Sequence, residues 1–488
     1  MSTRRLLGRL VQSVLVFSIL VFIFVPLRPH PRHMQKFLED STFGEDFVEV
    51  SPEQLKQNNA RMQLIWDELE VIYDAATPVP PTLHVKSQPS LISASSDERV
   101  PDYGGFIDMN ESEVQTMTEM HASVIRQLPE YPQELYQGNG IVMTGGGKYM
   151  RIALLSLRML RWNNSTLPVE LWMLDQSEYD EELCDYMHDQ LRVTCRRLDE
   201  IMDFKARQVK SYQLKVLSIM FSSFEHILFL DADNIPIVQP DFLFRSEPFR
   251  SHPIVAWQDF WQATMSPLIY KISGLDPDTE RKDVSHELLK KSTVESGQLL
   301  YNKRACWKAL CLSTWYNLFG PKWWYEMFSL DAPGEGDKET FLFSARVLRI
   351  NFWLVTKGVR PVGYFDRDGF QGTAMWQHNP LEDYIYTTYD NNTRINPIFS
   401  HSNFPKLDAT HLLGAWGLGD WRLWGTSVQR EVGYDMEREV WNQIKWIECD
   451  SPLGANESIH CQHVIEHLRN EKTWNEQDQV VPGKLPGH

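Results

Sequence analysis

Two aspartates separated by one alanine, Asp231 and Asp233, are the residues of this sequence best suited to chemistry. They follow an apolar run from His226 to Leu230, which is typical of a strand buried on both faces of a parallel sheet. Ligands of open α/β sheets bind beyond the carboxyl ends of such strands, and two carboxylates there can hold a divalent cation that also contacts substrate phosphates. The cation would stabilise the charge that develops on a departing diphosphate. An ordinary acidic turn before Pro236 is the structural alternative.

Strands and helices alternate around this aspartate pair. Apolar runs predict strands at 140–143, 168–174 and 226–230. Apolar residues on successive turns predict helices at 149–162 and 206–224. A turn of small residues, Thr144 to Gly147, separates the first strand from the first helix. The alternation predicts an α/β fold for this part of the chain.

Composition limits the class of protein. The 488 residues include 65 acidic and 48 basic side chains, and the net charge of −17 disfavours nucleic acid as a partner. Hydrophobic residues make up 42% and charged residues 23%, which is typical of a globular protein with a substantial core. The six cysteines form no CxxC pair, so a structural zinc site is not expected. Disulfides such as Cys184 with Cys195 and Cys449 with Cys461 would form in an oxidising compartment, and reduced buried cysteines are the alternative.

The N-terminal part differs in composition from the rest. An uncharged apolar run at 10–27 predicts an uncleaved transmembrane anchor after a cytoplasmic tail at 1–9. Pro- and Ser-rich passages predict a lumenal stem at 28–135 that buries little surface, although 111–127 has helical spacing and is expected to pack on the body. The body is expected at 136–470, before a flexible tail at 471–488. Sequons for N-glycosylation, which takes place in the secretory lumen, support this topology. They lie at Asn110, Asn163, Asn164, Asn391 and Asn456.

Six short segments, spread in order along the expected body, carry recognisable motifs. They are GIVMTGGGKYMRIALLSLRMLR (140–161), SSFEHILFLDADNIPIVQPDFLF (222–244), ESGQLLYNK (295–303), GEGDKETF (334–341), GTAMWQ (372–377) and HSNFPK (401–406). Together they resemble the fungal Golgi α-mannosyltransferases of glycosyltransferase family 71. Six segments in order are far more specific than a single aspartate pair.

The resemblance implies a type II Golgi membrane protein whose GT-A catalytic domain, a Rossmann-like mixed sheet flanked by helices, occupies 136–470. It implies retaining transfer of α-mannose from GDP-mannose to a mannosylated glycan acceptor, with Mn²⁺ as the metal. ESGQLLYNK and GDKETF are closer to the α-1,2 than to the α-1,3 branch, so α-1,2 linkages in the N-glycan outer chain or mannan are expected. Association with a Golgi mannosyltransferase complex is also expected. A lumenal glycoside hydrolase and a carbohydrate-binding protein are the alternatives of other classes.

The resemblance also implies roles for individual residues. Asp231 and Asp233 match the metal-binding pair of the family, and His401 is similar to the late histidine that completes the metal site in related GT-A enzymes. An ordinary loop histidine is the alternative for His401. Contacts with GDP-mannose are implied for Asp231, Asp233, Thr144, Gly145, Gly146, Lys215 and Lys406. The alternative for Thr144, Gly145 and Gly146 is an ordinary turn. The alternative for Lys215 and Lys406 is a solvated lysine without a ligand.

Three further carboxylates, Glu295, Asp337 and Glu339, lie in segments that resemble the donor-sugar loops of retaining enzymes. They are the catalytic candidates, although Asp337 also fits the N-cap of a short helix. Retention can proceed through a carboxylate nucleophile or by attack of the acceptor on the face that the diphosphate leaves. The sequence identifies no nucleophile.

Overall fold

The structure, a computed structural model, describes residues 52–470 and Trp474, with gaps at 134, 210–211, 277–281, 333–335, 390–394, 419–420 and 456–457. These residues belong to one unit, which begins at Asp46. The tail expected at 1–9, the anchor expected at 10–27, almost all of the tail expected at 471–488 and the sequons at Asn391 and Asn456 lie outside the described residues. None of the helices described is both long and apolar enough to cross a membrane.

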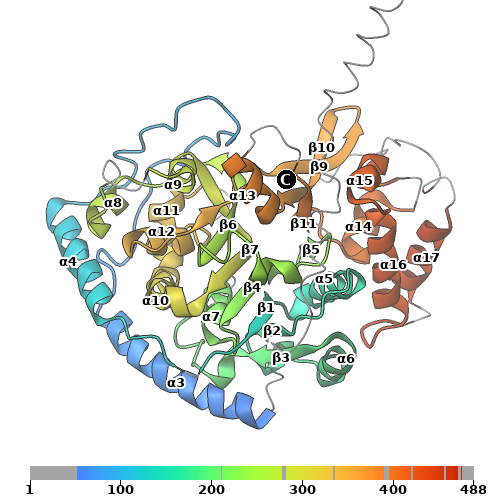
Figure 1. The fold of residues 1–488 in the computed structure, drawn as a ribbon, viewed down its shortest axis with the longest axis horizontal. Coiled ribbons are helices and arrows are strands. Elements are labelled where there is room, and N and C mark those ends of the chain that lie inside the picture. The colour runs from blue at the N-terminus through green and yellow to red at the C-terminus, as the bar shows by residue number, and fades with distance from the viewer. Residues whose placement is uncertain are drawn as a thin grey trace, which may run out of the picture. The chain divides into compact units, whose positions relative to one another are not determined.

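A mixed sheet forms the centre of the fold (Figure 1). Its strands are β1 Asn139–Thr144, β2 Val169–Met173, β3 Val193–Arg197, β4 His226–Asp231, β6 Ile254–Gln262, β7 Ser292–Asn302 and β8 Trp353–Leu354. Their order is β3-β2-β1-β4-β7-β6-β8. Strands β3, β2, β1 and β4 are parallel, whereas β7 is antiparallel to both β4 and β6. The expected α/β class is confirmed, and the sheet continues beyond the predicted strands in mixed orientation.

Alternate residues of β4 face two separate cores. Ile227 and Phe229 belong to one hydrophobic cluster, and Leu228 and Leu230 belong to the other. The first contains residues of α7 Gln213–Phe221, α8 Leu268–Ser273, α9 Val284–Leu289, α10 Lys303–Leu318, α11 Trp324–Ser329 and α12 Thr340–Val347. The second contains, or is contacted by, residues of α5 Met150–Trp162, α6 Glu181–Leu191, α13 Pro380–Tyr389, α14 Ala409–Trp416, α15 Gly425–Val432, α16 Met436–Cys449 and α17 Ile459–Arg469. Because β4 is buried on both faces, its sequence is continuously apolar.

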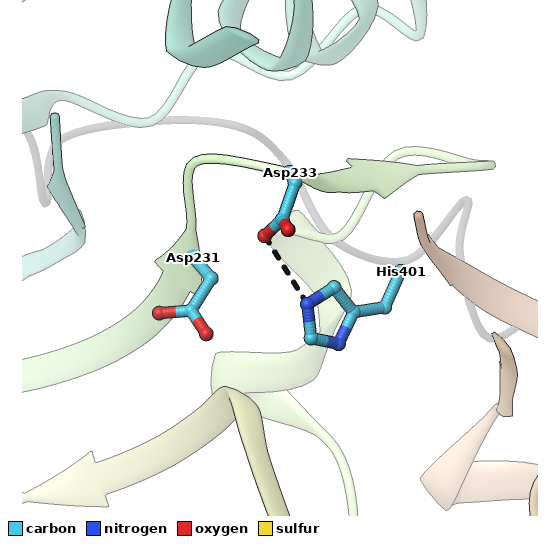
Figure 2. Close-up of side chains that lie close together, drawn as sticks. All are labelled: Asp231, Asp233 and His401. Atoms are coloured by element: carbon cyan, nitrogen blue, oxygen red, sulfur yellow. Dashed lines mark hydrogen bonds and ion pairs between the residues drawn. The ribbon is translucent and has the colours of Figure 1, made fainter. Parts of the chain in front are cut away.

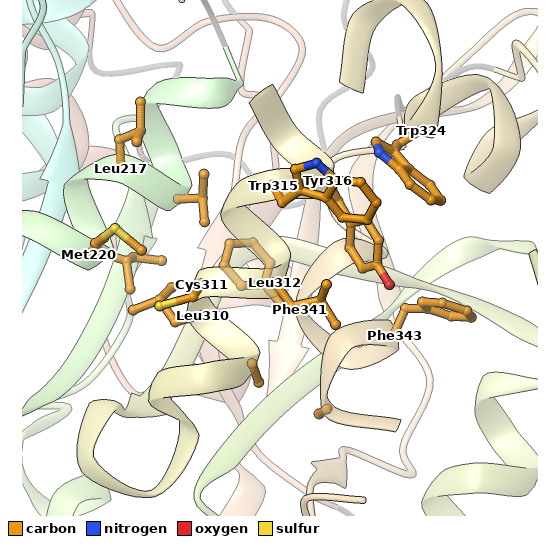
Figure 3. Packing of buried hydrophobic residues seen from close by; sticks show 14 of the residues in the cluster. Leu217, Met220, Leu310, Cys311, Leu312, Trp315, Tyr316, Trp324, Phe341 and Phe343 are labelled. Atoms are coloured by element: carbon orange, nitrogen blue, oxygen red, sulfur yellow. The ribbon is translucent and has the colours of Figure 1, made fainter. Parts of the chain in front are cut away.

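Large buried side chains of α7, α10 and α11 pack together in the first core (Figure 3). The ring centroids of Trp315 and Tyr316 on α10 lie 4.9 Å and 4.6 Å from that of Trp324. Leu217 and Met220 of α7 are fully buried in the same cluster. Each such side chain contributes roughly 1.5–3 kcal/mol when it is buried. The packing matters for function because α7 also carries Lys215.

A smaller antiparallel sheet follows directly from the central one. It consists of β5 Asn234–Pro236, β11 Pro397–His401, β10 Gly369–His378 and β9 Arg360–Asp366, in the order β5-β11-β10-β9. Since β4 ends at Asp231 and β5 begins at Asn234, the Asp-Ala-Asp segment joins the two sheets. The sequence did not predict this sheet, and its first strand is too short to show a periodic pattern.

The described part of the expected stem packs in the first core. Helix α3 (Pro52–Asp74) buries Met62, Trp66 and Tyr73, each at most 2% exposed, and α4 (Glu111–Gln127) has the bounds expected from its helical spacing. The expectation that this region buries little surface is therefore corrected for residues 52–135. The physical reason is an apolar stripe at helical spacing along α3, which buries surface despite the polar composition around it.

Helix α7 differs from its expected bounds, whereas the disulfides agree with the pairings considered. Helix α7 begins at Gln213 and not near 206, and Tyr212, which precedes it, is 48% exposed. Disulfides join Cys184 to Cys195 and Cys449 to Cys461, the two pairings considered from the sequence. Cys306 and Cys311 are free and buried.

Candidate metal and donor site

Asp231 and Asp233 lie where the two sheets meet. Asp231 is the last residue of β4, and Asp233 immediately precedes β5. The exposed fractions of their side chains are 25% and 11%. Figure 2 shows both carboxylates directed towards the space in front of the His401 imidazole. The side chains of both aspartates therefore stay partly exposed at the end of β4, and neither belongs to a hydrophobic core.

His401 reaches this pair from the smaller sheet. It is the last residue of β11, where its Cα is paired with that of Asn234 at the start of β5. Its Nε2 atom lies 3.1 Å from Oδ1 of Asp233. The backbone of the next residue, Ser402, donates to the carbonyl oxygen of Asp233 at 3.0 Å. Pairing of β5 with β11 thus carries a histidine to the aspartates over a long sequence separation.

The three side chains fit a divalent cation. One ligand atom from each of Asp231, Asp233 and His401 lies within 4.8 Å of the other two. Ligands that bind one ion at right angles, at about 2.1 Å, are about 3.0 Å apart, which matches the distance between His401 and Asp233. Two carboxylates with one imidazole are a donor set that suits Mn²⁺ better than Mg²⁺.

Two lysines each contact one of the aspartates. Lys215 Nζ donates to Oδ2 of Asp231 at 3.2 Å and to the carbonyl and hydroxyl oxygens of Ser296 at 3.1 Å and 2.8 Å. Lys406 Nζ donates to Oδ2 of Asp233. Both ammonium groups therefore lie beside the prospective metal ligands, where they can also meet phosphate oxygens.

Charges of opposite sign balance one another in this cluster. Burial would raise the pKa of Asp233, but His401 and Lys406 lower it below its usual range. Burial would lower the pKa of His401, but Asp233 and Glu295 raise it well above its usual value. The two carboxylates therefore favour the doubly protonated imidazole. A divalent cation can replace one of its protons, since metal binding at an imidazole releases it.

Two of the three catalytic candidates lie next to this cluster. Oε1 of Glu295 lies 3.5 Å from Nδ1 of His401. Oδ2 of Asp337 lies 3.7 Å from Nζ of Lys215 and has no hydrogen-bond partner among the described residues. Burial raises the pKa of Asp337. The alternative role of Asp337 as an N-cap is not observed, because α12 has no side-chain capping bond.

Glu339 is held away from the aspartates. Its Oε1 atom accepts a hydrogen bond from the backbone nitrogen of Val294 at 3.0 Å, and burial raises its pKa to about 7. The neighbouring Lys338 pairs with Asp259. The structure therefore brings Glu295 and Asp337, but not Glu339, into contact with the residues of the metal and donor site.

The glycine turn lies at the same sheet edge. The Cα of Thr144 is paired with that of Asp231 between β1 and β4. A Cβ atom on Gly145 would be 2.9 Å from Leu171, and Gly146 has a φ of 147°, so packing and backbone conformation already require both glycines. The alternative role of Gly145 and Gly146, formation of the turn, therefore has direct support. Binding of the donor by these glycines stays a prediction.

A cavity of about 800 Å³ opens beside this turn. Its lining includes Gly147 and the acidic side chains Glu178, Asp180, Glu181, Glu182 and Asp185. Carboxylates at this density repel a diphosphate. The two lysines beside the aspartates offer a more favourable position for phosphate.

Three residues that organise the site were given no role of their own from the sequence: Asn234, Ser296 and Gly297. Asn234 Nδ2 donates to the carbonyl oxygen of Gly297 at 2.7 Å, and Ser296 accepts from Lys215. Asn234 directly follows Asp233, and Ser296 and Gly297 belong to the segment that begins at Glu295, so proximity in sequence was the available signal.

The sequence family described as "Mannosyltransferase putative" matches residues 138–379. This range contains Asp231, Asp233 and Lys215, whereas His401 and Lys406 follow it.

Three relatives are fungal enzymes named as α-1,2-mannosyltransferases. MNN2 of Saccharomyces cerevisiae is 31% identical over 463 residues, which cover 78% of this chain and 77% of that protein. MNN21 of Candida albicans is 31% identical over 439 residues, which cover 75% and 66%, respectively. MNN24 of the same organism is 30% identical over 457 residues, which cover 73% and 64%. The chain thus spans just under two thirds of the length of the two Candida relatives.

Two solved structures also resemble the chain. They are the galactosyltransferase LgtC with donor and acceptor sugar analogues, at 11% identity, and mouse xyloside xylosyltransferase 1, at 14% identity. The TM-scores are 0.32 and 0.31. The matches cover 62% of this chain and 95% of LgtC, and 55% of this chain and 99% of the xylosyltransferase.

Proposed function

We propose, because the chain belongs to this family of mannosyltransferases, that it transfers α-mannose from GDP-mannose to a mannose-terminated glycan with retention of configuration. One observation carries the proposal: Asp231, Asp233 and His401 converge at the carboxyl end of β4. The mixed sheet with an acidic pair at that position also supports the GT-A assignment. The names of the relatives support α-1,2 linkages.

Asp231, Asp233 and His401 would hold Mn²⁺. When bound, the metal supplies positive charge that stabilises the departing GDP. Lys215 and Lys406 orient the carboxylates and can receive phosphate oxygens beside them. The protein's own cations would therefore stabilise charge on the same leaving group.

Asp337 is the catalytic carboxylate that we assign. Its Oδ2 atom, buried 3.7 Å from Nζ of Lys215, accepts no hydrogen bond from the described residues, whereas Glu339 accepts one from the backbone of Val294. Lys215 lies between Asp231 and Asp337, so it places the carboxylate close to the proposed position of the diphosphate. A carboxylate nucleophile displaces the leaving group from the opposite face of the sugar, and a second displacement by the acceptor then gives retention.

We also assign the protein to the Golgi membrane, with the body in the lumen. The apolar run at 10–27 supports an anchor, and the two disulfides suit an oxidising compartment. A mannosylated glycan acceptor and a Golgi mannosyltransferase complex are the partners that fit this location.

The test is to incubate the purified full-length chain with GDP-mannose, Mn²⁺ and an α-mannose acceptor, and to determine the linkage of the product. We expect GDP release coupled to a new α-1,2-linked mannose. An α-1,3 product would correct the linkage alone. Release of mannose from a glycan without GDP-mannose would instead favour the glycoside hydrolase, and glycan binding without turnover would favour a carbohydrate-binding protein.

A further inference from the structure

The imidazole of His401 lies directly against Gly297 of β7. A Cβ atom added to Gly297 would be 2.6 Å from both Cε1 and Nδ1 of the ring, closer than carbon atoms approach in proteins. The φ of Gly297 lies outside the left-handed region, so the backbone conformation there does not itself require glycine. The missing side chain therefore makes room for the histidine ring.

Glu295 approaches the same ring from the side opposite the aspartates. Its Oε1 atom accepts a hydrogen bond from the backbone nitrogen of Gly297 at 2.6 Å and lies 3.5 Å from Nδ1 of His401. The side chains of Glu295 and His401 are only 11% and 8% exposed, so water has little access to this contact. Nδ1 has no hydrogen-bond partner among the described residues, so the carboxylate 3.5 Å away is the charged group that favours a proton on that nitrogen. A proton on Nδ1 leaves the lone pair of Nε2 to a cation.

The backbone at Gly297 is bonded to β5, the strand that directly follows Asp233 and pairs with the strand of His401. Asn234, fully buried at the start of β5, donates from Nδ2 to the carbonyl oxygen of Gly297 at 2.7 Å and to Oε1 of Gln298 at 2.6 Å. Its Cα is paired with that of His401. The ring, the glycine below it and the carboxylate beside it therefore have fixed relative positions.

We infer that residues Glu295, Ser296 and Gly297 form a positioning segment that holds His401 in the tautomer and orientation needed for a divalent cation. Glu295 then acts through His401 as a positioning residue and is not the nucleophile. Ser296 holds Lys215 by two hydrogen bonds, so one segment positions groups on both sides of the site. The inference rests on the proposed function, because it concerns the same metal.

The first experiment measures Mn²⁺ binding to the purified full-length chain by the EPR signal of free Mn²⁺. Removing an outer partner of a metal ligand weakens metal affinity about 10- to 100-fold, and we expect a loss of this size for both Gly297→Ala and Glu295→Gln. Gly358→Ala is the matched control, because nothing lies within 4 Å of a Cβ atom at that position. Thermal unfolding of each variant shows whether the fold is retained.

A second experiment separates positioning of the ring from a general disturbance. In a His401→Ala background, Gly297→Ala should cause no further loss of Mn²⁺ affinity, because the ring that it displaces is absent. An equal loss in both backgrounds, or wild-type affinity in Gly297→Ala and Glu295→Gln, would overturn the inference. If Gly297→Ala does not fold, the Mn²⁺ affinity of Glu295→Gln is compared in the wild-type and His401→Ala backgrounds. A loss in the wild-type background alone would support the inference, and an equal loss in both would overturn it.

Transfer activity at increasing Mn²⁺ separates positioning from nucleophilic catalysis. Glu295→Gln should need more Mn²⁺ for half-maximal activity and should recover most of the wild-type rate at saturation. A rate that stays low at saturating Mn²⁺ would identify Glu295 as a catalytic group and overturn the inference while leaving the proposed function intact. If the wild-type chain neither binds Mn²⁺ nor depends on it for transfer, the proposed metal site fails, and the inference fails with it.

Discussion

Nε2 of His401 lies 3.1 Å from Oδ1 of Asp233, although 168 positions separate the two residues in the chain. Two sheets meet at this contact, since Asp233 follows the strand β4 of the central sheet and His401 ends β11 of the smaller one. The three prospective metal ligands thus depend on how the sheets are joined.

Replacing either aspartate should remove transfer. We expect Asp231→Asn and Asp233→Asn each to lower kcat/KM by about 10²- to 10³-fold, because a metal ion contributes several kcal/mol to charge stabilisation in the transition state. Initial rates with GDP-mannose and thermal unfolding should be measured together. Asp67→Asn, a change of the same kind on the exposed side of α3, is the control. Near-normal rates in either site variant would refute the assigned metal role.

Removal of the metal should have the same effect as removal of its ligands. Excess EDTA should stop the reaction, and Mn²⁺ should restore it more effectively than Mg²⁺ because an imidazole belongs to the donor set. The measurement is the rate of GDP release in chelator followed by titration with each metal. Full turnover in EDTA would exclude a metal-dependent reaction.

Asp337→Asn should reduce kcat strongly and change the affinity for GDP only slightly. The substitution keeps the shape of this buried side chain and removes its negative charge beside Lys215. We propose that this carboxylate reacts with the sugar. Single-turnover rates and GDP binding by calorimetry would report the two quantities separately. A large loss of GDP affinity with an unchanged chemical step would instead place Asp337 in donor binding.

Buried His121 should make folding stability depend on pH. It contacts the hydroxyl of Tyr316 at 2.6 Å, and burial lowers its pKa to about 4. Between pH 6.5 and 4 the unfolded chain binds a proton at this histidine that the folded chain does not, so the free energy of unfolding falls as the pH falls. The total contribution is on the order of 3 kcal/mol. Unfolding by urea at several pH values should show a smaller slope for His121→Gln, and identical slopes would contradict the prediction.

The structure distinguishes two overlapping sequons. The amide nitrogen of Asn163 donates to the carbonyl oxygens of Met159 and Pro236, both at 3.0 Å, whereas Asn164 is exposed. A glycan on Asn163 would disrupt these bonds, so we expect glycosylation of Asn164 only, in protein from a eukaryotic secretory host. Glycopeptide mass spectrometry can assign the site. A glycan on Asn163, or none on either residue, would contradict this prediction and its assumption of a lumenal body.

The segment from His226 to Asp233 could be interpreted from sequence because its information is local. A continuous apolar run followed directly by two aspartates predicted both the buried strand and the position of the acidic pair at its end, and the structure shows both. Strands at 140–143 and 168–174 were predicted on the same basis. The expectation that residues 28–135 bury little surface was wrong for α3, because polar composition obscured the apolar stripe of that helix.

The sequence by itself determined which residue types were available for metal and phosphate binding and which short segments form strands and helices. Only the tertiary structure decided that His401, implied by a family resemblance, contacts Asp233 and that Gly297 makes room for its ring. The physical reason is that the pairing of β5 with β11, and the contacts of Gly297 on β7 with His401 and Asn234, join segments far apart in the chain. Such contacts leave no periodic pattern in any one segment, because the burial that stabilises them exists only after the sheets have formed.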